Sequence, residues 1–368
     1  MRTRSFLHEI RKTSGFSAAE LAKRAGVSRQ TIYAMEDGSF VPNTAIALRL
    51  ARILGVTVEQ LFALHDENAA ETIEAELLPG KSGIVEDGQF VRLCRVNGRM
   101  TAVPVPLFPA YLPAADGVIR GRSARCASVQ SAAGPSLKGG QFLLAGCDPA
   151  LSLLSEVLNH SRYEIVAVPC ASRRALEWLR KGRVHAAGSH LFDSASGAYN
   201  VPAIKRVFPQ GGVRIVTFAM WEQGIVLGRG NPKSIRSVAD VASKRVTLIN
   251  REKGSGSRDL LDKHLRKAGI RTERVTGYES LADGHLSAAD AVASGVADCC
   301  VATRSAARCF GLDFIPLAIE RFDLSFPETS LAIPAARALL DEMNGSRLKR
   351  RLEAMAGYDT AHTGEVVA

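Results

Sequence analysis

The chain has 368 residues, of which 46% are hydrophobic and 23% charged, a composition that excludes a wholly disordered protein. At about 100–200 residues per domain we expect two or three domains, and no apolar run approaches the roughly 18 residues of a membrane span. The 47 Lys+Arg against 37 Asp+Glu leave a formal net charge of +10, which favours polyanionic partners or anionic ligands.

Residues 1–66 are predicted to form a compact helical domain. An apolar helical stripe begins at Phe6 and stops near Gly15. Four further helical runs follow, AAELAKRA, RQTIYAMED, TAIALRLARIL and VEQLFAL, and Ser17 and Ser28 are placed to cap the first two of them. Because the joints between the runs are short, we expect one all-α unit.

The runs AAELAKRA and RQTIYAMED have the pattern of a helix-turn-helix. Gly26 supplies the tight turn, and Leu21, Ala25 and Ile32 belong to a set of small and apolar residues that can form one inner face. Ser28 caps the second helix and leaves polar side chains on its exposed N-terminal turns, where a recognition helix presents base-reading groups. The alternative is an ordinary helical hairpin with a polar outer face.

A longer match supports the DNA-binding interpretation. Residues 5–64 resemble the lambda-repressor-like helix-turn-helix domains of the Xre regulator family, through LAKRAGVSRQTI, the following EDG, the PNT at 42–44 and the closing LARILGV. This resemblance implies binding to a double-stranded DNA operator. Family members usually carry Gln directly after the residue that opens the first helix of the pair, where this chain has Ala18. The candidate DNA-binding residues are Ser17, Lys23, Ser28, Arg29, Gln30, Thr31, Tyr33 and Asn43.

Residues 67–140 are predicted to be a linker and a β-rich connector. The segment HDENAAETIEAELLPG is acidic and breaks at Pro79-Gly80, which suggests a linker or a short helix. Asn97-Gly98 separates two runs of strand character and predicts a hairpin. Five prolines from Pro104 to Pro135 favour an irregular chain. The segment offers no evident chemistry, so a structural or dimerising role is the default expectation.

From Gln141 onward, runs typical of strands alternate with runs typical of helices. FLLAGC, EIVAVPC and VTLINRE are strand-like, whereas ASRRALEWLRKG and SRDLLDKHLRKAG are helical. Alternation at this spacing predicts an α/β domain with a mostly parallel sheet over residues 141–368, enough for two lobes. The predicted fold class is therefore multidomain: an all-α head, a short β-rich connector and a two-lobed α/β domain.

Four clusters in this α/β domain lie where strands should end and helices begin, at residues 145–149, 188–191, 250–258 and 294–298. In open α/β sheets, ligands lie beyond the carboxyl ends of strands. Glycines there let backbone N–H groups approach an anion at a helix N-terminus, and hydroxyls with an arginine would complete an oxyanion or carboxylate site. The candidate ligand-binding residues are Cys147, Asp148, Ser189, His190, Tyr199, Asn200, Arg251, Gly254, Ser255, Gly256, Ser257, Arg258 and Asp298.

Each of these clusters taken alone has an ordinary alternative. The GSGSR run is more often a flexible turn, and Asp148 before a proline can simply cap a helix. His185 and His190 share no helix face, so we predict no metal pair. Cys299-Cys300 in an apolar strand are expected to be buried, inert thiols. Trp221 is as consistent with core packing as with a cleft lining.

The order of the motifs carries more weight than any one of them. GCDPALSLL, GSHLFD with a later YN, NREKGSGSRDLLD and AVASGVADC resemble the periplasmic-binding-protein-like domain of certain cytoplasmic regulators, over about residues 141–350. That domain is related to type II solute-binding proteins such as molybdate-binding protein. The resemblance implies two lobes that close on a small molecule. Molybdate or tungstate is suggested by kinship alone, because type II folds also take sulfate, phosphate, amino acids and organic acids.

We therefore predict a cytoplasmic one-component transcription regulator that acts as a homodimer or a higher homo-oligomer and senses a small anion. No GxSxG elbow or other catalytic set is present, so we predict no enzymatic activity, no cofactor and no membrane partner. Seven cysteines without CxxC favour reduced thiols, and the basic N-terminus has no apolar segment typical of a secretory signal. The alternatives are an enzyme or handling protein of molybdenum-cofactor metabolism with a DNA-binding head, and a thiol-based redox regulator using Cys147 or Cys299-Cys300.

Overall fold

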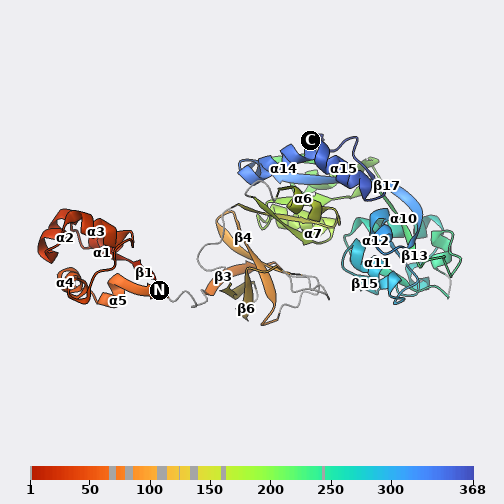
Figure 1. The fold of residues 1–368 in the computed structure, drawn as a ribbon. Coiled ribbons are helices and arrows are strands. Elements are labelled where there is room, and N and C mark those ends of the chain that lie inside the picture. The colour runs from red at the N-terminus through yellow and green to blue at the C-terminus, as the bar shows by residue number, and fades with distance from the viewer. Residues whose placement is uncertain are drawn as a thin grey trace. The chain divides into compact units, whose positions relative to one another are not determined.

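A computed structural model shows how these segments fold (Figure 1). The structure describes residues 2–65, 72–78, 86–105, 114–123, 125–132, 140–158, 163–242 and 245–368. They belong to two compact units, a smaller one that holds the N-terminal residues up to Thr72 and a larger one that holds most of the chain from Ile73 onward. Within the described ranges, no helix combines the length and apolarity that crossing a membrane requires.

The N-terminal unit is a helical bundle closed by one pair of short strands. Its elements are β1 (Arg2–Ser5), α1 (Leu7–Thr13), α2 (Ala18–Ala25), α3 (Arg29–Glu36), α4 (Thr44–Leu54), α5 (Val58–Leu61) and β2 (Phe62–His65). Strands β1 and β2 pair antiparallel, which the sequence did not predict. The predicted turn between α2 and α3 is confirmed, because Gly26 takes a left-handed conformation with φ of +69°. Leu21, Ile32 and Met35 are completely buried between the helices, as the inner face requires.

Five strands between residues 72 and 131 form a closed β-barrel, whereas Pro106, Pro109, Pro113 and Pro135 of the predicted irregular chain lie outside the described residues. Its strands are β3 (Thr72–Leu77), β4 (Phe90–Val96), β5 (Arg99–Pro104), β6 (Gly117–Arg122) and β7 (Cys126–Ser131), in the order β3-β5-β4-β6-β7 around the barrel. The hairpin at Asn97-Gly98 is confirmed, and both residues have positive φ, 49° and 79°. Residues 72–77 form a strand where we expected a linker or helix, and Pro79-Gly80 lies outside the described residues.

The barrel packs on the α/β domain within the same unit. Arg92 of β4 lies 2.6 Å from the carboxylate of Glu164, and Arg183 lies 2.6 Å from Glu76 of β3. Leu78 next to the barrel also joins the hydrophobic core that covers one face of the large sheet. The barrel was not predicted from the sequence, because each of its strands is short and the strand pairing brings together residues far apart in the chain.

Residues 141–368 form one twisted sheet shared by two lobes. Its strands follow the order β15-β14-β16-β13-β17-β10-β8-β9. The elements are β8 (Gln141–Gly146), α6 (Leu151–Leu158), β9 (Glu164–Pro169), α7 (Ser172–Arg180), β10 (Ala186–Ser189), β11 (Phe192–Asp193), β12 (Ala198–Tyr199), α8 (Val201–Val207), β13 (Val213–Leu227), α9 (Val238–Val241), β14 (Leu248–Arg251), α10 (Gly256–Lys267), a 3-10 turn (Thr272–Arg274), β15 (Leu281–Ala282), α11 (His285–Ala293), β16 (Cys299–Thr303), α12 (Arg304–Cys309), β17 (Asp313–Pro327), α13 (Glu328–Leu331), α14 (Pro334–Asn344), α15 (Ser346–Ala354) and β18 (Tyr358–Asp359).

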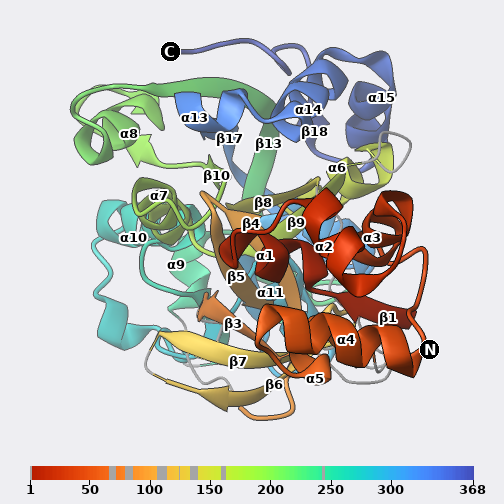
Figure 2. The same ribbon diagram turned by 90° about the vertical axis from the view of Figure 1, so that its left-hand side faces the viewer.

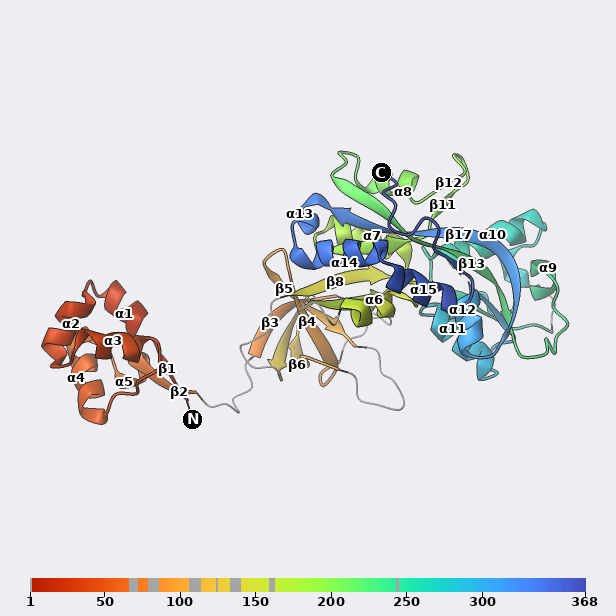
Figure 3. The ribbon, with the colours of Figure 1, turned by 45° about the horizontal axis from the view of Figure 1, so that its top comes forward.

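Two long strands connect the lobes. Strands β13 and β17 are 15 residues each, pair antiparallel over their whole length, and run from one lobe into the other (Figure 3). We call lobe 1 the half that contains β8, β9 and β10, and lobe 2 the half that contains β14, β15 and β16. In lobe 1, β8 pairs parallel with β9 and β10, and in lobe 2, β14 pairs parallel with β15 and β16, as predicted. The antiparallel pairs that β10 forms with β17, and β16 with β13, were not predicted.

Helices cover both faces of the sheet in each lobe. In lobe 1, helices α6, α14 and α15 pack on one another over one face (Figure 2), and α7 covers the opposite face. In lobe 2, α10 and α11 cover opposite faces. The fold class predicted from the sequence is thus confirmed, with a closed barrel in place of the connector.

Candidate functional site

The third helix of the N-terminal unit presents a polar surface. Ser28 caps α3 by accepting a hydrogen bond from the backbone N–H of Thr31, at 3.0 Å. Arg29, Gln30 and Tyr33 are exposed, and the Arg29 guanidinium donates to the Tyr33 hydroxyl at 2.9 Å. Among the other candidates, Ser17 and Asn43 cap α2 and α4, and Lys23 is exposed on α2.

A buried ion pair holds α1 against α3. Arg11 Nε lies 2.5 Å from Glu36 Oε1, and both side chains are less than a tenth exposed. Arg11 also donates to the carbonyl of Phe16, at 2.9 Å. Burial alone would raise the pKa of Glu36, but hydrogen bonds from Arg11 and His8 lower it below its usual value. This pair fixes α3 against α1, and it leaves no local signal in the sequence because 25 residues separate Arg11 from Glu36.

The α/β domain gathers polar residues at the carboxyl ends of its parallel strands, as predicted. Cys147 follows β8, His190 follows β10, Arg251 ends β14, and His285 begins α11 directly after β15. Strands β8 and β10 belong to lobe 1, and β14 and β15 to lobe 2. The site therefore lies where strand ends of the two lobes meet.

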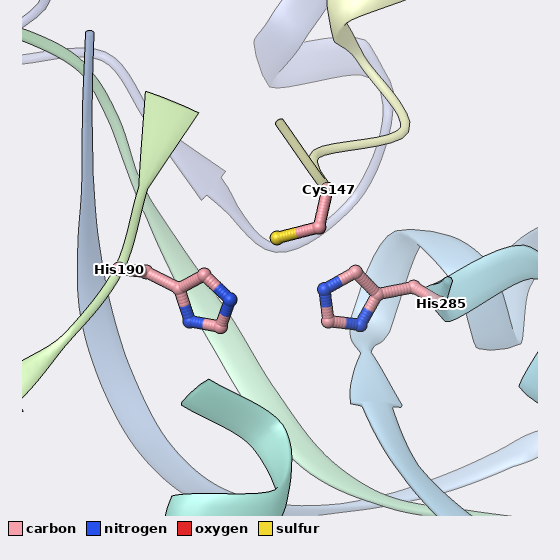
Figure 4. Close-up of side chains that lie close together, drawn as sticks. All are labelled: Cys147, His190 and His285. Atoms are coloured by element: carbon pink, nitrogen blue, oxygen red, sulfur yellow. The ribbon is translucent and has the colours of Figure 1, made fainter. Parts of the chain in front are cut away.

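Cys147, His190 and His285 form the centre of this site. Figure 4 shows their side chains pointing toward one another from three different elements. One ligand atom from each residue, a sulfur and two ring nitrogens, lies within 4.8 Å of the other two. All three residues are at most 5% exposed. No sequence signal indicated His285, because the histidines considered from the sequence as a metal pair, His185 and His190, are close together in the chain. His185 does not join the centre and accepts a hydrogen bond from the backbone N–H of Leu143.

The two long strands supply a second layer of side chains around His190. His190 Nδ1 lies 2.7 Å from Glu320 Oε2 of β17, and Gln223 of β13 donates to the same oxygen at 2.6 Å. The Trp221 ring is centred 5.0 Å from the His190 ring and 5.2 Å from that of His285. From the sequence, Trp221 was equally consistent with the core and with a cleft lining. In the structure it is buried and contacts two site residues.

Electrostatics divide the two imidazoles. Burial opposes charge on His190, but Cys147 and Glu320 outweigh it and raise the pKa of His190 to about 10. Burial and the nearby Arg251 guanidinium hold the pKa of His285 well below its usual range. Burial and Arg251 therefore both favour the neutral form of His285.

Buried polar atoms around this centre have no hydrogen-bond partner among the described residues. The donors are Ser189 Oγ, Ser257 Oγ, Arg251 Nη1 and Trp221 Nε1. The oxygens Gln223 Oε1 and Asp148 Oδ2, His190 Nε2 and both ring nitrogens of His285 are also unpaired. Leaving such groups buried and unpaired costs about 1–3 kcal/mol each, and more for charged groups. A concentration of such atoms at the strand ends indicates a site for a polar ligand that accepts hydrogen bonds.

The GSGSR loop closes the site from lobe 2. Ser255 caps α10, and Gly256 lies so close to His190 that a Cβ there would be 2.5 Å from its ring. The Arg258 guanidinium donates to the carbonyl of Arg251 at 3.3 Å and lies 4.5 Å from the ring centroid of Tyr278. Arg258 thus supports the loop, whereas Arg251 carries the unpaired nitrogen.

The structure does not bring every candidate to this centre. The Tyr199 hydroxyl donates to the carbonyl of Ile319, and Asn200 bonds Asp323 and the backbone of Leu191. Asp148, by contrast, lies beside the centre: its Oδ2 is unpaired, and burial raises its pKa to about 6 although His190 is close enough to lower it. Its Oδ1 accepts from the backbone N–H of Ala150 and from the Tyr358 hydroxyl. Gly254 accepts a hydrogen bond from the Arg173 backbone N–H at 3.4 Å.

Asp298 lies at the opposite ends of the strands, just before β16 begins. Its carboxylate accepts from the backbone N–H of Thr247 at 2.8 Å and lies 3.7 Å from Lys233. The reason is the direction of β16: the cluster at residues 294–298 precedes this strand, whereas the site collects residues that follow strands. We therefore leave Asp298 out of the candidate site.

The thiols suggested for a redox response lie in different surroundings. Cys299 and Cys300 are completely buried in β16, and burial raises the pKa of Cys299 to about 12 and raises the pKa of Cys300 as well. Because the thiolate is the reactive form, this environment disfavours a redox role for the pair. Cys147, in contrast, lies beside His190, and His190 in turn lies 2.7 Å from Glu320.

Two parts of the chain match known protein families. Residues 155–344 match the family model of the PBP superfamily domain, and residues 4–64 match a helix-turn-helix domain. The uncharacterized protein YvgK of Bacillus subtilis is 30% identical over 226 residues, which are 61% of this chain and 73% of YvgK. An uncharacterized HTH-type transcriptional regulator of Methanothermobacter thermautotrophicus is 43% identical over 67 residues, 18% of this chain and 97% of that regulator.

Some solved structures align with part of this chain at low sequence identity. A phosphate ABC transporter substrate-binding protein from Clostridium perfringens aligns with a TM-score of 0.46 and 12% identity, covering 59% of this chain and 98% of that one. The sulfate-binding protein SubI from Mycobacterium tuberculosis aligns with a TM-score of 0.43 and 16% identity, covering 60% of this chain and 86% of that one.

Proposed function

This chain belongs to the PBP superfamily and carries a helix-turn-helix domain, and from that premise we propose that it is a cytoplasmic transcription regulator controlled by a small oxyanion. The DNA-binding surface is the exposed N-terminal part of α3. The effector site is the set of buried donors at the strand ends, and molybdate or tungstate is the effector class to test first. The protein acts on its operator as a homodimer, without enzymatic activity.

The observation that carries this proposal is the set of unpaired donors. Ser189 Oγ, Ser257 Oγ and the Arg251 Nη1 atom are buried and free of partners among the described residues. A tetrahedral oxyanion offers several acceptor oxygens and negative charge, so it would satisfy hydroxyl and guanidinium donors together. Sulfate, phosphate, molybdate and tungstate share this chemistry, which is why the donors alone do not select among them.

The same donors suggest how an effector acts on the protein. Ser189 belongs to lobe 1, and Arg251 and Ser257 to lobe 2, so one bound anion contacts both lobes. Arg173 of lobe 1 and Asp259 of lobe 2 lie 2.6 Å apart, which shows that the lobes already meet beside the loop. An effector that binds better when the lobes meet shifts the equilibrium toward that state, and its effect on operator affinity equals this difference in affinity.

The direct test is a thermal-shift panel on the full chain with molybdate, tungstate, sulfate, phosphate and small organic acids. An effector at about 100 times its dissociation constant adds about 2.7 kcal/mol of stability, a shift of several degrees. Operator binding measured by fluorescence anisotropy should then change with the same anion and with the same midpoint. A flat panel, or a shift that leaves operator binding unchanged, contradicts the proposal.

Replacing Gln30 by alanine tests the recognition helix. Gln30 is exposed on the first turn of α3, where glutamine can read an adenine edge through two hydrogen bonds. We expect Gln30→Ala to weaken binding to the specific operator by about 1–3 kcal/mol, with little change for unrelated DNA. Glu59→Gln, at an exposed position of α5, is the control and should leave both affinities unchanged. Equal losses on specific and unrelated DNA would rule out base reading by Gln30.

A further inference from the structure

We infer that Cys147, His190 and His285 form a binding site for a borderline or soft transition-metal ion of the Zn²⁺ or Cu⁺ class. This inference rests on the proposed function in one respect, because it adds a metal to the same effector site. Three ligand atoms within 4.8 Å of one another, all on buried residues, are the observation from which it starts (Figure 4).

The donor atoms identify the class of metal. A thiolate and two imidazoles suit Zn²⁺ and Cu⁺, whereas Mg²⁺ and Ca²⁺ require oxygen ligands. His190 Nε2 and both nitrogens of His285 have no hydrogen-bond partner among the described residues. Cys147 and Glu320 favour the protonated form of His190, so a metal ion would displace the proton from its Nε2. Buried nitrogens without partners are costly, and coordination to a metal would satisfy one nitrogen on each ring.

The surroundings of His190 have the form of a metal site's outer layer. Histidine ligands generally donate their second ring N–H to a carboxylate, which fixes the ring and leaves the other nitrogen free to coordinate. His190 Nδ1 has this partner in Glu320 Oε2, at 2.7 Å, and Gln223 donates to the same oxygen at 2.6 Å. Nε2 is the ring nitrogen left without a partner.

The metal would link the two lobes and leave room for the effector. Cys147 and His190 come from lobe 1 and His285 from lobe 2, so coordination by all three requires the lobes to meet. Three protein ligands on a tetrahedral ion leave a fourth position for an exogenous ligand. The unpaired donors Ser189, Arg251 and Ser257 are the groups that would bind the outer oxygens of an anion in that position.

Cobalt(II) is the spectroscopic probe for this site. We expect the full-length protein, freed of metal with a chelator, to bind one equivalent of Co²⁺ and to develop thiolate-to-cobalt charge-transfer absorption with the intense visible bands of a tetrahedral ion. Zn²⁺ should displace the cobalt and abolish both bands. Cys147→Ser should abolish the charge-transfer band, and Glu320→Gln should weaken Co²⁺ binding by about 10- to 100-fold through loss of the outer-layer carboxylate.

Control variants keep the test decisive. Cys300→Ser removes a buried thiol of β16 outside the cluster and should leave the cobalt spectrum unchanged. His285→Gln provides a second ligand variant if Cys147→Ser fails to fold, which circular dichroism would reveal. Absence of the charge-transfer band in the folded wild-type protein, or its persistence in Cys147→Ser, overturns the metal site.

The same preparations separate this inference from the proposed function. If the chelator-treated protein responds to an oxyanion in the thermal-shift and operator assays but binds no Co²⁺, the metal site is wrong and the regulator proposal stands. If Co²⁺ binds as expected while no metal or anion alters operator binding, the metal site stands and the regulator proposal fails.

Discussion

Replacing Arg251 by methionine should nearly eliminate binding of the anionic effector. Arg251 is 1% exposed, and its Nε and Nη2 atoms donate to the Glu252 carboxylate at 3.0 and 3.4 Å. Its Nη1 atom has no partner among the described residues and is the donor that remains for an anion. Removing one partner of a buried, charged hydrogen bond costs about 2–5 kcal/mol, which is roughly 30-fold to several thousand-fold in affinity. Isothermal titration calorimetry with the anion that gives the largest thermal shift measures this loss.

Two control variants show whether the loss belongs to the site. Arg180→Met removes an exposed arginine of α7 and should leave the affinity unchanged. Arg258→Met removes an arginine whose guanidinium already contacts the Arg251 carbonyl and Glu279, so it should weaken binding less than Arg251→Met. An effector affinity in Arg251→Met equal to that of the wild type would exclude Arg251 from the anion site.

Replacing Arg11 by methionine should greatly lower the free energy of unfolding of the helix-turn-helix unit. The substitution leaves the Glu36 carboxylate buried, with His8 as its remaining partner. Breaking a buried ion pair from one side costs about 3–5 kcal/mol, because a charge is left without compensation. Hydrogen exchange of the α1 and α3 amides in the full chain measures the local free energy of unfolding, and specific DNA binding should weaken with it.

The double variant and the pH dependence identify the cause. Arg11→Met with Glu36→Leu removes both charges and should recover most of the stability. The pKa of Glu36 is lower in the folded unit than its ordinary value of 4.5, so this carboxylate stabilises the wild type above that pH. The contribution is lost as the pH falls through the folded pKa. A double variant that is as unstable as Arg11→Met, or as sensitive to acid as the wild type, would contradict this account.

Local patterns were sufficient for the parts of the protein built from neighbouring residues. The capping serines, the turn at Gly26 and the inner face of α2 and α3 depend on spacings of a few residues, so the helix-turn-helix could be predicted. The hairpin at Asn97-Gly98 follows from the positive φ that its turn requires. The strand-end residues Cys147, His190 and Arg251 followed from the rule that α/β sheets bind ligands at carboxyl ends.

Pairing between distant segments was not accessible in the same way. The barrel requires β3 to pair with β5, and the lobes depend on β13 and β17 pairing over 15 residues from segments 100 positions apart, Val213 to Asp313. Such pairings leave no periodic signal in a single stretch of chain. Glu222 and Gln223 within β13, and Pro316 within β17, also interrupt the apolar runs, so neither segment looks like one long strand.

The amino-acid sequence by itself therefore determined the fold class, the helix-turn-helix and the strand ends at which the candidate site lies. Only the tertiary structure decided the chemistry of that site. His285 and Glu320 reach His190 from 95 and 130 residues away in the chain, and Arg251 instead of Arg258 keeps a free donor because Arg258 is occupied by neighbouring groups. Local residue preferences act over a few positions, whereas a binding site depends on which distant side chains the packed core brings together.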